Sequence, residues 1–222
     1  ADYYPRLTEV IHNKVAAVQL MNDQAQIGLA IGGPLLLLLI GLAPWVITLL
    51  YSKEFAPAVE LLQWQSVGNV FKLAGWALGF SIVAAGRSKT FFLLQVNFNV
   101  IFLLLLWPTL TKFGIAAAGP AFTIAYLLQL TAVFLVVRVV HNFRWQPLSL
   151  KLLFLHGSLA VVLLAAAQNF PVGVAAASIA LALGTGVFGI RVVLSKTGKQ
   201  GSLPTRLYVI FERLGWPIQL AV

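Results

Sequence analysis

The sequence predicts an all-α protein, a polytopic transmembrane helix bundle with six spans and both termini in the cytoplasm. The 222 residues are 60% hydrophobic and only 9% charged, whereas an average soluble domain carries about 25% charged residues. Six segments approach or exceed the ~20 apolar residues that a membrane-crossing helix needs. The Lys and Arg residues fall mostly between these segments. This composition excludes a soluble enzyme and a disordered tail.

Six apolar segments are predicted to form the membrane-spanning helices. They cover residues 25–51, 64–85, 91–110, 114–137, 150–168 and 171–194. A helix in a soluble core would need a polar face at 3.6-residue spacing, and these segments mostly lack one. The turn from Gln168 to Pro171 makes the last two segments a tight helical hairpin. Residues 25–140 are therefore expected to hold four spans, and residues 141–195 two additional spans.

The segments outside the spans are predicted to lie in water or at the membrane surface. Residues 1–24 are expected to form a cytoplasmic amphipathic loop or helix, and residues 196–222 a cytoplasmic tail. Within this tail, apolar side chains recur at helical spacing over residues 207–214, which predicts an interfacial helix. Residues 52–60 are predicted to form a short amphipathic helix on the outer surface, with Pro57 near its first turn.

The positive charges predict the orientation of the chain. Twelve of the 15 Lys and Arg residues fall on one side of the predicted membrane: Arg6, Lys14, Arg87, Lys89, Arg138, Arg144, Lys151, Arg191, Lys196, Lys199, Arg206 and Arg213. The other side holds Lys53 and Lys112, and Lys72 lies within a span. Because cytoplasmic loops collect Lys and Arg, both termini are placed in the cytoplasm. The net charge of +9 is attributed to this topology, and no nucleic-acid partner is expected.

Lys72 is the most informative residue, because a charge inside a membrane helix costs at least about 2.5–3.5 kcal/mol. Gln65, Asn69, Lys72 and Trp76 stand at i, i+4, i+7 and i+11 and share one stripe of the helix. This stripe predicts a cavity for a negatively charged ligand with sugar rings, since an ammonium meets phosphate as a point charge. In the alternative interpretation, Lys72 extends its ammonium to the outer interface.

Further polar side chains lie on the third and fourth spans: Gln95, Asn97, Asn99, Thr123, Tyr126 and Gln129. Gln95 and Asn99 share a face at i, i+4, whereas Asn97 is expected to point elsewhere. These groups are expected either to line the same cavity or to form hydrogen bonds to neighbouring helices. The candidate substrate-binding residues are therefore Lys72, Asn69, Gln65, Trp76, Gln95, Asn99, Tyr126 and Gln129.

Glycine and proline add local features to these helices. Gly68, Gly75 and Gly79 are predicted to form a small-residue face for close helix contact. Pro34, Pro44 and Pro120 have two open interpretations. They either kink their helices and allow the bundle to change conformation, or they are irregularities without a function.

The residues that are absent also restrict the function. No Asp or Glu occurs from residue 61 to residue 211, so a cation exporter lacks the membrane carboxylate that it needs here, and an anionic substrate is favoured. His12, His141 and His156 are isolated and are expected at the interface, without metal-ligand partners. No cysteine and no nucleotide-binding or nucleophile motif is present. Enzyme activity, a metal and a cofactor are therefore not expected.

Several short sequence blocks resemble a known family. They are Asp2–Leu7, Leu50–Phe55, Leu62–Asn69, Trp76–Phe80 and Ala84–Lys89. In this order they are similar to the C-terminal lobe of bacterial O-antigen and lipid-linked polysaccharide flippases. These belong to the multidrug/oligosaccharidyl-lipid/polysaccharide exporter superfamily. The resemblance covers roughly residues 1–140.

The resemblance implies a transporter of two six-helix lobes around a central basic cavity. Such proteins serve O-antigen and lipopolysaccharide biosynthesis as multi-pass proteins of the bacterial inner membrane. They move an undecaprenyl-diphosphate-linked oligosaccharide between leaflets by alternating access. The chain is then expected to be a fragment, with its first four spans ending the second lobe and its last two lying beyond the core. Expected partners are the lipid-linked anionic oligosaccharide, membrane lipids, and glycan polymerase or assembly proteins.

The resulting hypothesis is that Lys72 captures the diphosphate while the amides and Trp76 contact the glycan. Arg6, Arg87 and Lys89 are candidates for attracting the headgroup at the cytoplasmic mouth, or they serve topology alone. Two other functions are considered, a multidrug or small-solute exporter of the same fold and a non-transporting scaffold for glycan assembly.

Overall fold

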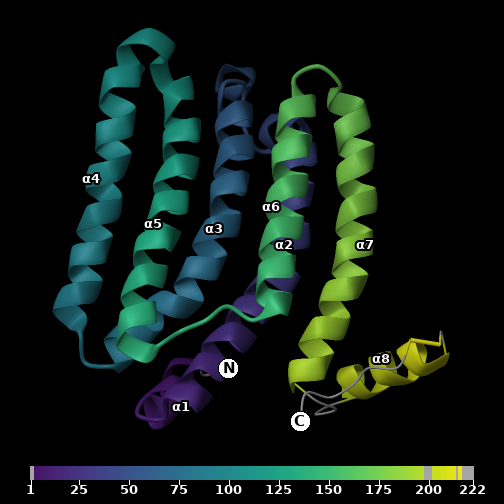
Figure 1. Ribbon diagram of the computed structural model, residues 1–222. Coiled ribbons are helices and arrows are strands. Elements are labelled where there is room, and N and C mark those ends of the chain that lie inside the picture. The colour runs from purple at the N-terminus through teal and green to yellow at the C-terminus, as the bar shows by residue number, and fades with distance from the viewer. Residues whose placement is uncertain (1–2, 198–201, 214, 217–222) are drawn as a thin grey trace.

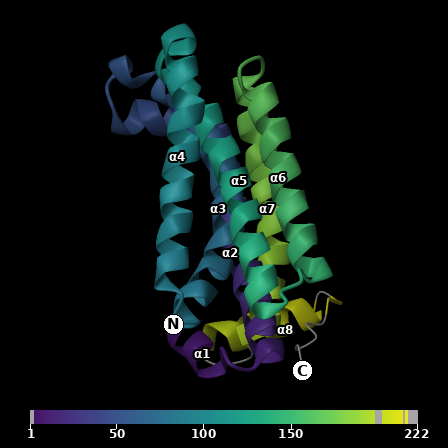
Figure 2. The ribbon, with the colours of Figure 1, turned by 60° about the vertical axis from the view of Figure 1, so that its left-hand side comes forward.

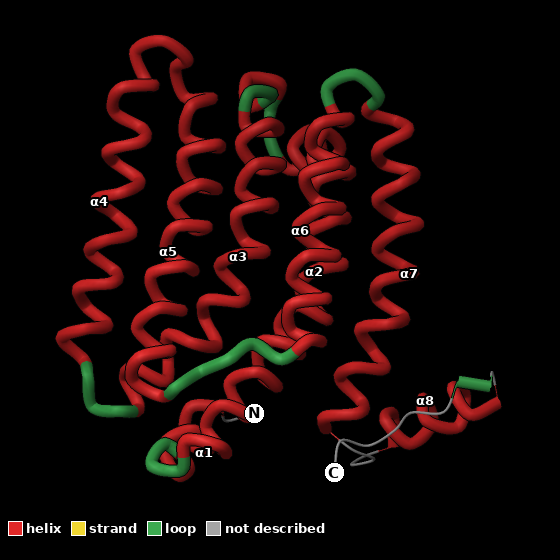
Figure 3. Tube along the Cα trace, in the orientation of Figure 1, coloured by secondary structure: helices red, strands yellow, loops and turns green. Residues whose placement is uncertain are grey.

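The computed structural model describes residues 3–197, 202–213 and 215–216. Within these ranges the regular structure is entirely helical, which confirms the predicted all-α class. Long helices lie side by side, and α1 and α8, the first and last described helices, lie at the same end of the bundle (Figure 1). The connections between the long helices are short (Figure 3). Lys199, where a cytoplasmic charge was predicted, and Leu214, the last residue of the predicted interfacial helix, lie outside the described residues.

The helices follow one another up and down the bundle. They are α1 (Tyr3–Val10), α2 (Lys14–Leu50), the 3-10 turn η1 (Lys53–Phe55), α3 (Ala58–Ala84), α4 (Ser88–Phe113), the 3-10 turn η2 (Gly114–Ala117), α5 (Ala118–His141), α6 (Pro147–Ala167), α7 (Pro171–Thr197) and α8 (Ser202–Arg213). Five stretches of the described chain are long and apolar enough to cross a membrane. One of them, Ser88–His141, contains both α4 and α5, which fold back on each other (Figure 1). These lengths and compositions are those of a membrane-embedded helix bundle.

The helix boundaries near the N-terminus add detail to the predicted segments. Helix α2 begins at Lys14, within the segment predicted as a cytoplasmic loop or helix, and the Asn13 side chain caps it by accepting a hydrogen bond from the Ala16 N–H at 3.2 Å. The predicted surface helix at 52–60 is instead the turn η1 and the start of α3. Pro57 ends the turn and precedes the first residue of α3, where the missing N–H of proline costs nothing.

Helix α2 is the centre of the packing. It packs most extensively on α7 and α3, and it also contacts α6. Figures 1 and 2 show the C-terminal helices α6 and α7 standing alongside it rather than apart from the bundle. Fully buried Leu29, Leu37 and Ile40 of α2 join Val70 and Leu78 of α3 in one apolar core. The last two long helices are thus as firmly joined to α2 as the earlier ones.

Two prolines interrupt the hydrogen bonding of α2, and a neighbouring helix packs against each gap. Pro44 has no N–H to donate to the Ile40 carbonyl, and the buried Gln63 Nε2 of α3 donates to that oxygen at 3.0 Å. Pro34 leaves the Ala30 carbonyl in the same position. Gly189 of α7 lies so close that a Cβ there would be 2.2 Å from the Ala30 oxygen. These contacts hold α3 and α7 at fixed heights along α2.

Polar side chains join the other end of α2 to the start of α6. Asn22 is fully buried, and its Nδ2 donates to the Arg144 carbonyl at 3.0 Å. Its Oδ1 accepts from the Gln146 N–H and from Ser149 Oγ, both at 2.8 Å. Next to it, Asp23 of α2 pairs with Lys196 of α7 at 2.7 Å. The chain connecting α5 to α6 is therefore held against α2.

The Gln63→Leu substitution is expected to destabilise the bundle by about 1–3 kcal/mol, because it leaves the buried Ile40 carbonyl without a donor. In a Pro44→Ala background, the new alanine supplies that N–H, so the same substitution is expected to cost much less. Unfolding of the single and double variants in mixed detergent micelles measures this coupling. Equal costs in both backgrounds would contradict the assignment of Gln63 to the proline gap.

The Gly189→Ala substitution is expected to separate α7 from α2, because a Cβ meets the Ala30 carbonyl. Gly184, on the same helix, has no neighbouring atom within 4 Å of the place that a Cβ would take, and it provides the control. Gly184→Ala is expected to be neutral or stabilising by up to about 1 kcal/mol through helix propensity. Thermal unfolding of both variants measures the difference, and similar melting temperatures would refute the close α2–α7 contact.

Candidate functional site

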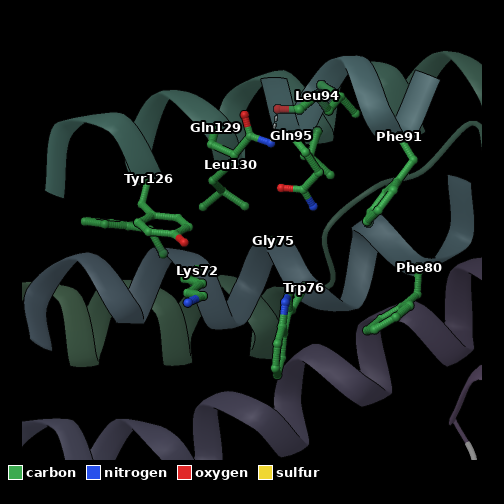
Figure 4. A pocket seen from close by; sticks show the side chains of 13 residues that line it. Lys72, Gly75, Trp76, Phe80, Phe91, Leu94, Gln95, Tyr126, Gln129 and Leu130 are labelled. Carbon is green, nitrogen blue, oxygen red and sulfur yellow. Dashed lines mark hydrogen bonds between the residues drawn. The ribbon is translucent and has the colours of Figure 1, made fainter. Parts of the chain in front are cut away.

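A groove lies between α3, α4 and α5, and we call it the Lys72 groove. Its volume is about 240 Å³. Five of the eight predicted cavity residues line it: Lys72, Trp76, Gln95, Tyr126 and Gln129. Figure 4 shows these side chains around one space, with α3 on one side and α4 and α5 on the other. Aromatic and aliphatic side chains, including Phe91 and Leu130, complete the lining.

The glycines of α3 have two different roles. A Cβ at Gly68 would lie 2.7 Å from the Phe122 ring, so this residue allows close contact with α5 as predicted. A Cβ at Gly75 or Gly79 would make only ordinary contacts, at 3.7 and 3.5 Å. These two glycines line the groove instead. Because they carry no side chain, they leave its α3 wall open.

Lys72 lies near the middle of α3, since the helix begins six residues before the predicted span. About 18 Å of helix separates it from the nearer helix end, at 1.5 Å per residue. Its Nζ stands over the Tyr126 ring at 5.3 Å from the centroid. Within the described part of the chain, no carboxylate or hydrogen-bond acceptor is recorded for this ammonium. The ring partly compensates the charge by a cation–π contact.

Gln129 lines the groove and also joins two helices. Its Nε2 donates to the Leu94 carbonyl at 2.9 Å, and its Oε1 accepts from Asn97 Nδ2 at 3.4 Å (Figure 4 shows the first). Asn97, predicted to point elsewhere, therefore takes part in the α4–α5 contact. Thr123 Oγ1 likewise donates to the Trp64 carbonyl of α3 at 2.8 Å. Hydrogen bonding between helices, one of the two open interpretations, is thus observed for Gln129 and Thr123.

Three predicted cavity residues lie outside the Lys72 groove. Asn69 lines a second groove, of about 310 Å³ between α2 and α3, which Lys72 and Trp76 also border. Gln65 shares their stripe but lies about 10 Å from Lys72 along the helix axis. Asn99 is exposed, and its Nδ2 donates to the Gln95 carbonyl of its own helix at 2.8 Å. Sharing a helical face therefore does not place residues in one cavity.

The three candidate mouth residues are exposed at the end of the bundle that carries both termini. Arg6 lies on α1, Arg87 precedes α4, and Lys89 is in the first turn of α4. None of them lines the Lys72 groove. Helix α1 is held against α3, because Tyr3 OH donates a hydrogen bond to the Ala77 carbonyl at 2.6 Å. Burial raises the pKa of Tyr3, so this phenol stays a donor.

Tyr3 and Tyr4 bring α1 to one edge of the groove. Their ring centroids lie 6.3 and 6.2 Å from that of Phe80, which lines the groove. Trp76 stands one turn further along α3, 61% exposed.

The prediction that all three histidines lie at the interface is wrong for two of them. His12 is exposed, but His141 and His156 are buried, with 4% and 0% of their surface accessible. His156 packs on Gly33 of α2, and the Gly pair at 32–33 is the sequence signal that indicates a close neighbour there. Among the described residues, no three His, Asp or Glu side chains come together in a group that could hold a metal ion.

Comparison of the chain with protein families, with curated proteins and with solved structures finds no match. Function is therefore inferred from the residues and from the geometry described above.

Proposed function

We propose that this chain forms part of a transporter that flips an undecaprenyl-diphosphate-linked oligosaccharide across the bacterial inner membrane. The observation that carries the proposal is the Lys72 ammonium, which lies in the middle of an apolar helix beside a groove. No carboxylate pairs with it in the described ranges, and Asp and Glu are absent from residues 61–211. An unpaired cation at such a position favours an anionic ligand.

The proposed topology has six spans, α2 to α7, with both termini in the cytoplasm. Helices α2 to α7 alternate in direction, so the ends that carry the positive charges come together. The described basic residues other than Lys72, Lys53 and Lys112 lie on α1, on α8, in the α3–α4 and α5–α6 loops, or in the parts of α2 and α4 to α7 nearest to these segments. Cytoplasmic faces collect Lys and Arg, which supports placing this end in the cytoplasm.

The groove is suited to a headgroup rather than to a whole glycan. Complete ligand pockets commonly measure about 300–1,000 Å³, and the Lys72 groove measures about 240 Å³. A phosphate group can meet Lys72 as a point charge and displace its weaker contact with the Tyr126 ring. Trp76 offers an exposed ring at the groove on which a sugar face can stack. The prenyl chain would remain in the lipid, along the exposed apolar faces of the helices.

Replacing Lys72 by Ala is expected to reduce export of the lipid-linked oligosaccharide by roughly 10–100-fold, since a hydrogen bond to a charged group contributes about 1.5–3 kcal/mol. Lys72→Arg keeps the charge and is expected to retain part of the activity. Lys112→Ala, outside the groove, is the matched control. The measurement is flipping by the full-length protein in vesicles, with protein amounts equalised.

The outcomes of this experiment separate the alternative functions. Unchanged export in Lys72→Ala would contradict the proposal and favour a non-transporting scaffold. Transport of cationic or neutral solutes without the lipid-linked oligosaccharide would instead identify a small-solute exporter.

The absence of cysteine makes the topology directly testable. Asn169→Cys places a thiol in the α6–α7 turn, and Ser88→Cys places one at the start of α4. A membrane-impermeant maleimide is expected to label the Asn169→Cys variant in intact spheroplasts and the Ser88→Cys variant only after permeabilisation. The reverse pattern, or labelling of both variants in intact spheroplasts, would overturn the proposed six-span topology.

A further inference from the structure

His156 is a buried ionisable side chain with a free lone pair. It lies in the interior of α6 and none of its surface is accessible. Its Nδ1 lies 2.9 Å from the Leu152 carbonyl oxygen. Because a carbonyl only accepts hydrogen bonds, Nδ1 must carry the proton of the neutral ring. Nε2 then holds the lone pair, and it has no hydrogen-bond partner among the described residues.

The ring lies directly on the backbone of α2. A Cβ at Gly33 would be 2.4 Å from the His156 Cδ2 and 2.6 Å from its Nε2. The residue after Gly33 is Pro34, where α2 lacks one of its own hydrogen bonds. On the same helix as His156, a Cβ at Gly157 would lie 4.0 Å from the ring of Phe71. Phe71 directly precedes Lys72. At the level of His156, α6 therefore contacts α2 next to Pro34 and α3 next to Lys72.

No charged partner compensates the ring. The helices that pack against α6 are α2, α3 and α7. Their charged residues, with that of α6 itself, are Lys14, Asp23, Glu60, Lys72, Lys151, Arg191 and Lys196. In the part of the chain that the structure describes, none of them forms an ion pair or a recorded hydrogen bond with His156. Asp23 pairs with Lys196, Lys72 faces Tyr126, and Lys151 stands over the ring of Phe188.

We propose that His156 Nε2 is a proton-binding site that couples transport through the Lys72 groove to a proton gradient. The inference rests on the proposed transport function. In the observed packing a proton on Nε2 creates an N–H without an acceptor and a charge without a partner, both of which are costly in an apolar interior. The ring cannot relax toward α2, because Gly33 already touches it. Proton binding therefore favours a second arrangement in which the α2–α6 contact opens and water reaches the ring.

Because protonation of His156 disfavours the observed packing, the direction of the pH effect can be predicted. The observed, closed arrangement holds the neutral ring, so it is favoured at high pH. Acidification favours the open arrangement as the ring takes up a proton, in the pH range where imidazole titrates, about pH 5–8. Because α6 contacts α3 next to Lys72, opening of the α2–α6 contact also changes the packing of α6 on α3, which forms one wall of the Lys72 groove.

The test compares the full-length wild-type protein with His156→Gln, which keeps polarity but does not titrate. His12→Gln is the control, because it removes the exposed histidine. Two quantities are measured in vesicles or micelles: the melting temperature from about pH 8 to about pH 5, and the flipping rate with and without a pH gradient. If His156→Gln fails to fold, His156→Leu, which fills the site with apolar bulk, takes its place.

The wild type and the His12→Gln control are expected to lose melting temperature on acidification, and the His156 variant is expected to lose much less. A gradient of one pH unit is expected to change the wild-type flipping rate by up to about tenfold, because it supplies about 1.4 kcal/mol for each proton moved. The His156 variant is expected to retain flipping that depends on Lys72 and to ignore the gradient. Wild-type pH dependence in the His156 variant would overturn the proton site.

Failure of the proton site and failure of the proposed function give different results. Flipping that depends on Lys72, combined with pH responses that do not depend on His156, refutes the proton site alone. Absence of flipping, combined with a melting temperature whose pH dependence disappears in the His156 variant, refutes the transported substrate and supports the proton site.

Discussion

The structure depends on one constraint, that a polar backbone group in an apolar bundle must find a partner within the protein. Helix α2 breaks this rule twice, at Pro34 and Pro44. Gln63 of α3 supplies the missing donor at one gap, and Gly189 of α7 packs against the carbonyl at the other. These two contacts come from different helices, so the same features that interrupt α2 also fix its neighbours along it. The central position of α2 in the packing follows from this.

The same constraint separates structural polar side chains from functional candidates. Asn22, Thr123 and Gln129 are buried and donate to carbonyls of other segments, so they act as connections between helices. Lys72 and His156 do not fit this pattern. The Lys72 ammonium faces only the Tyr126 ring, and the His156 Nε2 has no partner in the described chain. A polar group without an internal partner is costly, and a ligand or proton that binds it offsets that cost.

The sequence predicts the helices well because long apolar runs between charged loops leave few alternatives. The helix class and the position of Lys72 within a span agree with the structure. Residues 1–24 could be predicted only as a loop or a helix, because the polar residues 14–24 do not resemble a span; the structure places the helix start at Lys14, after the Asn13 cap. Periodicity placed Asn99 on the face of Gln95 but could not show that Asn99 lies outside the groove, because it gives the face of a helix but not which neighbour covers it. The burial of His156 depends on Gly33, a contact between residues far apart in the sequence.

The central claim is that the Lys72 groove recognises the diphosphate of a lipid carrier. The most direct measurement is binding of undecaprenyl diphosphate and of uncharged undecaprenol to the purified full-length protein and to its Lys72→Ala variant. The wild type is expected to prefer the diphosphate by roughly tenfold or more, the equivalent of about 1.4 kcal/mol, and the variant is expected to lose this preference. Equal binding of the two lipids by the wild type, or an unchanged preference in the variant, would contradict the claim.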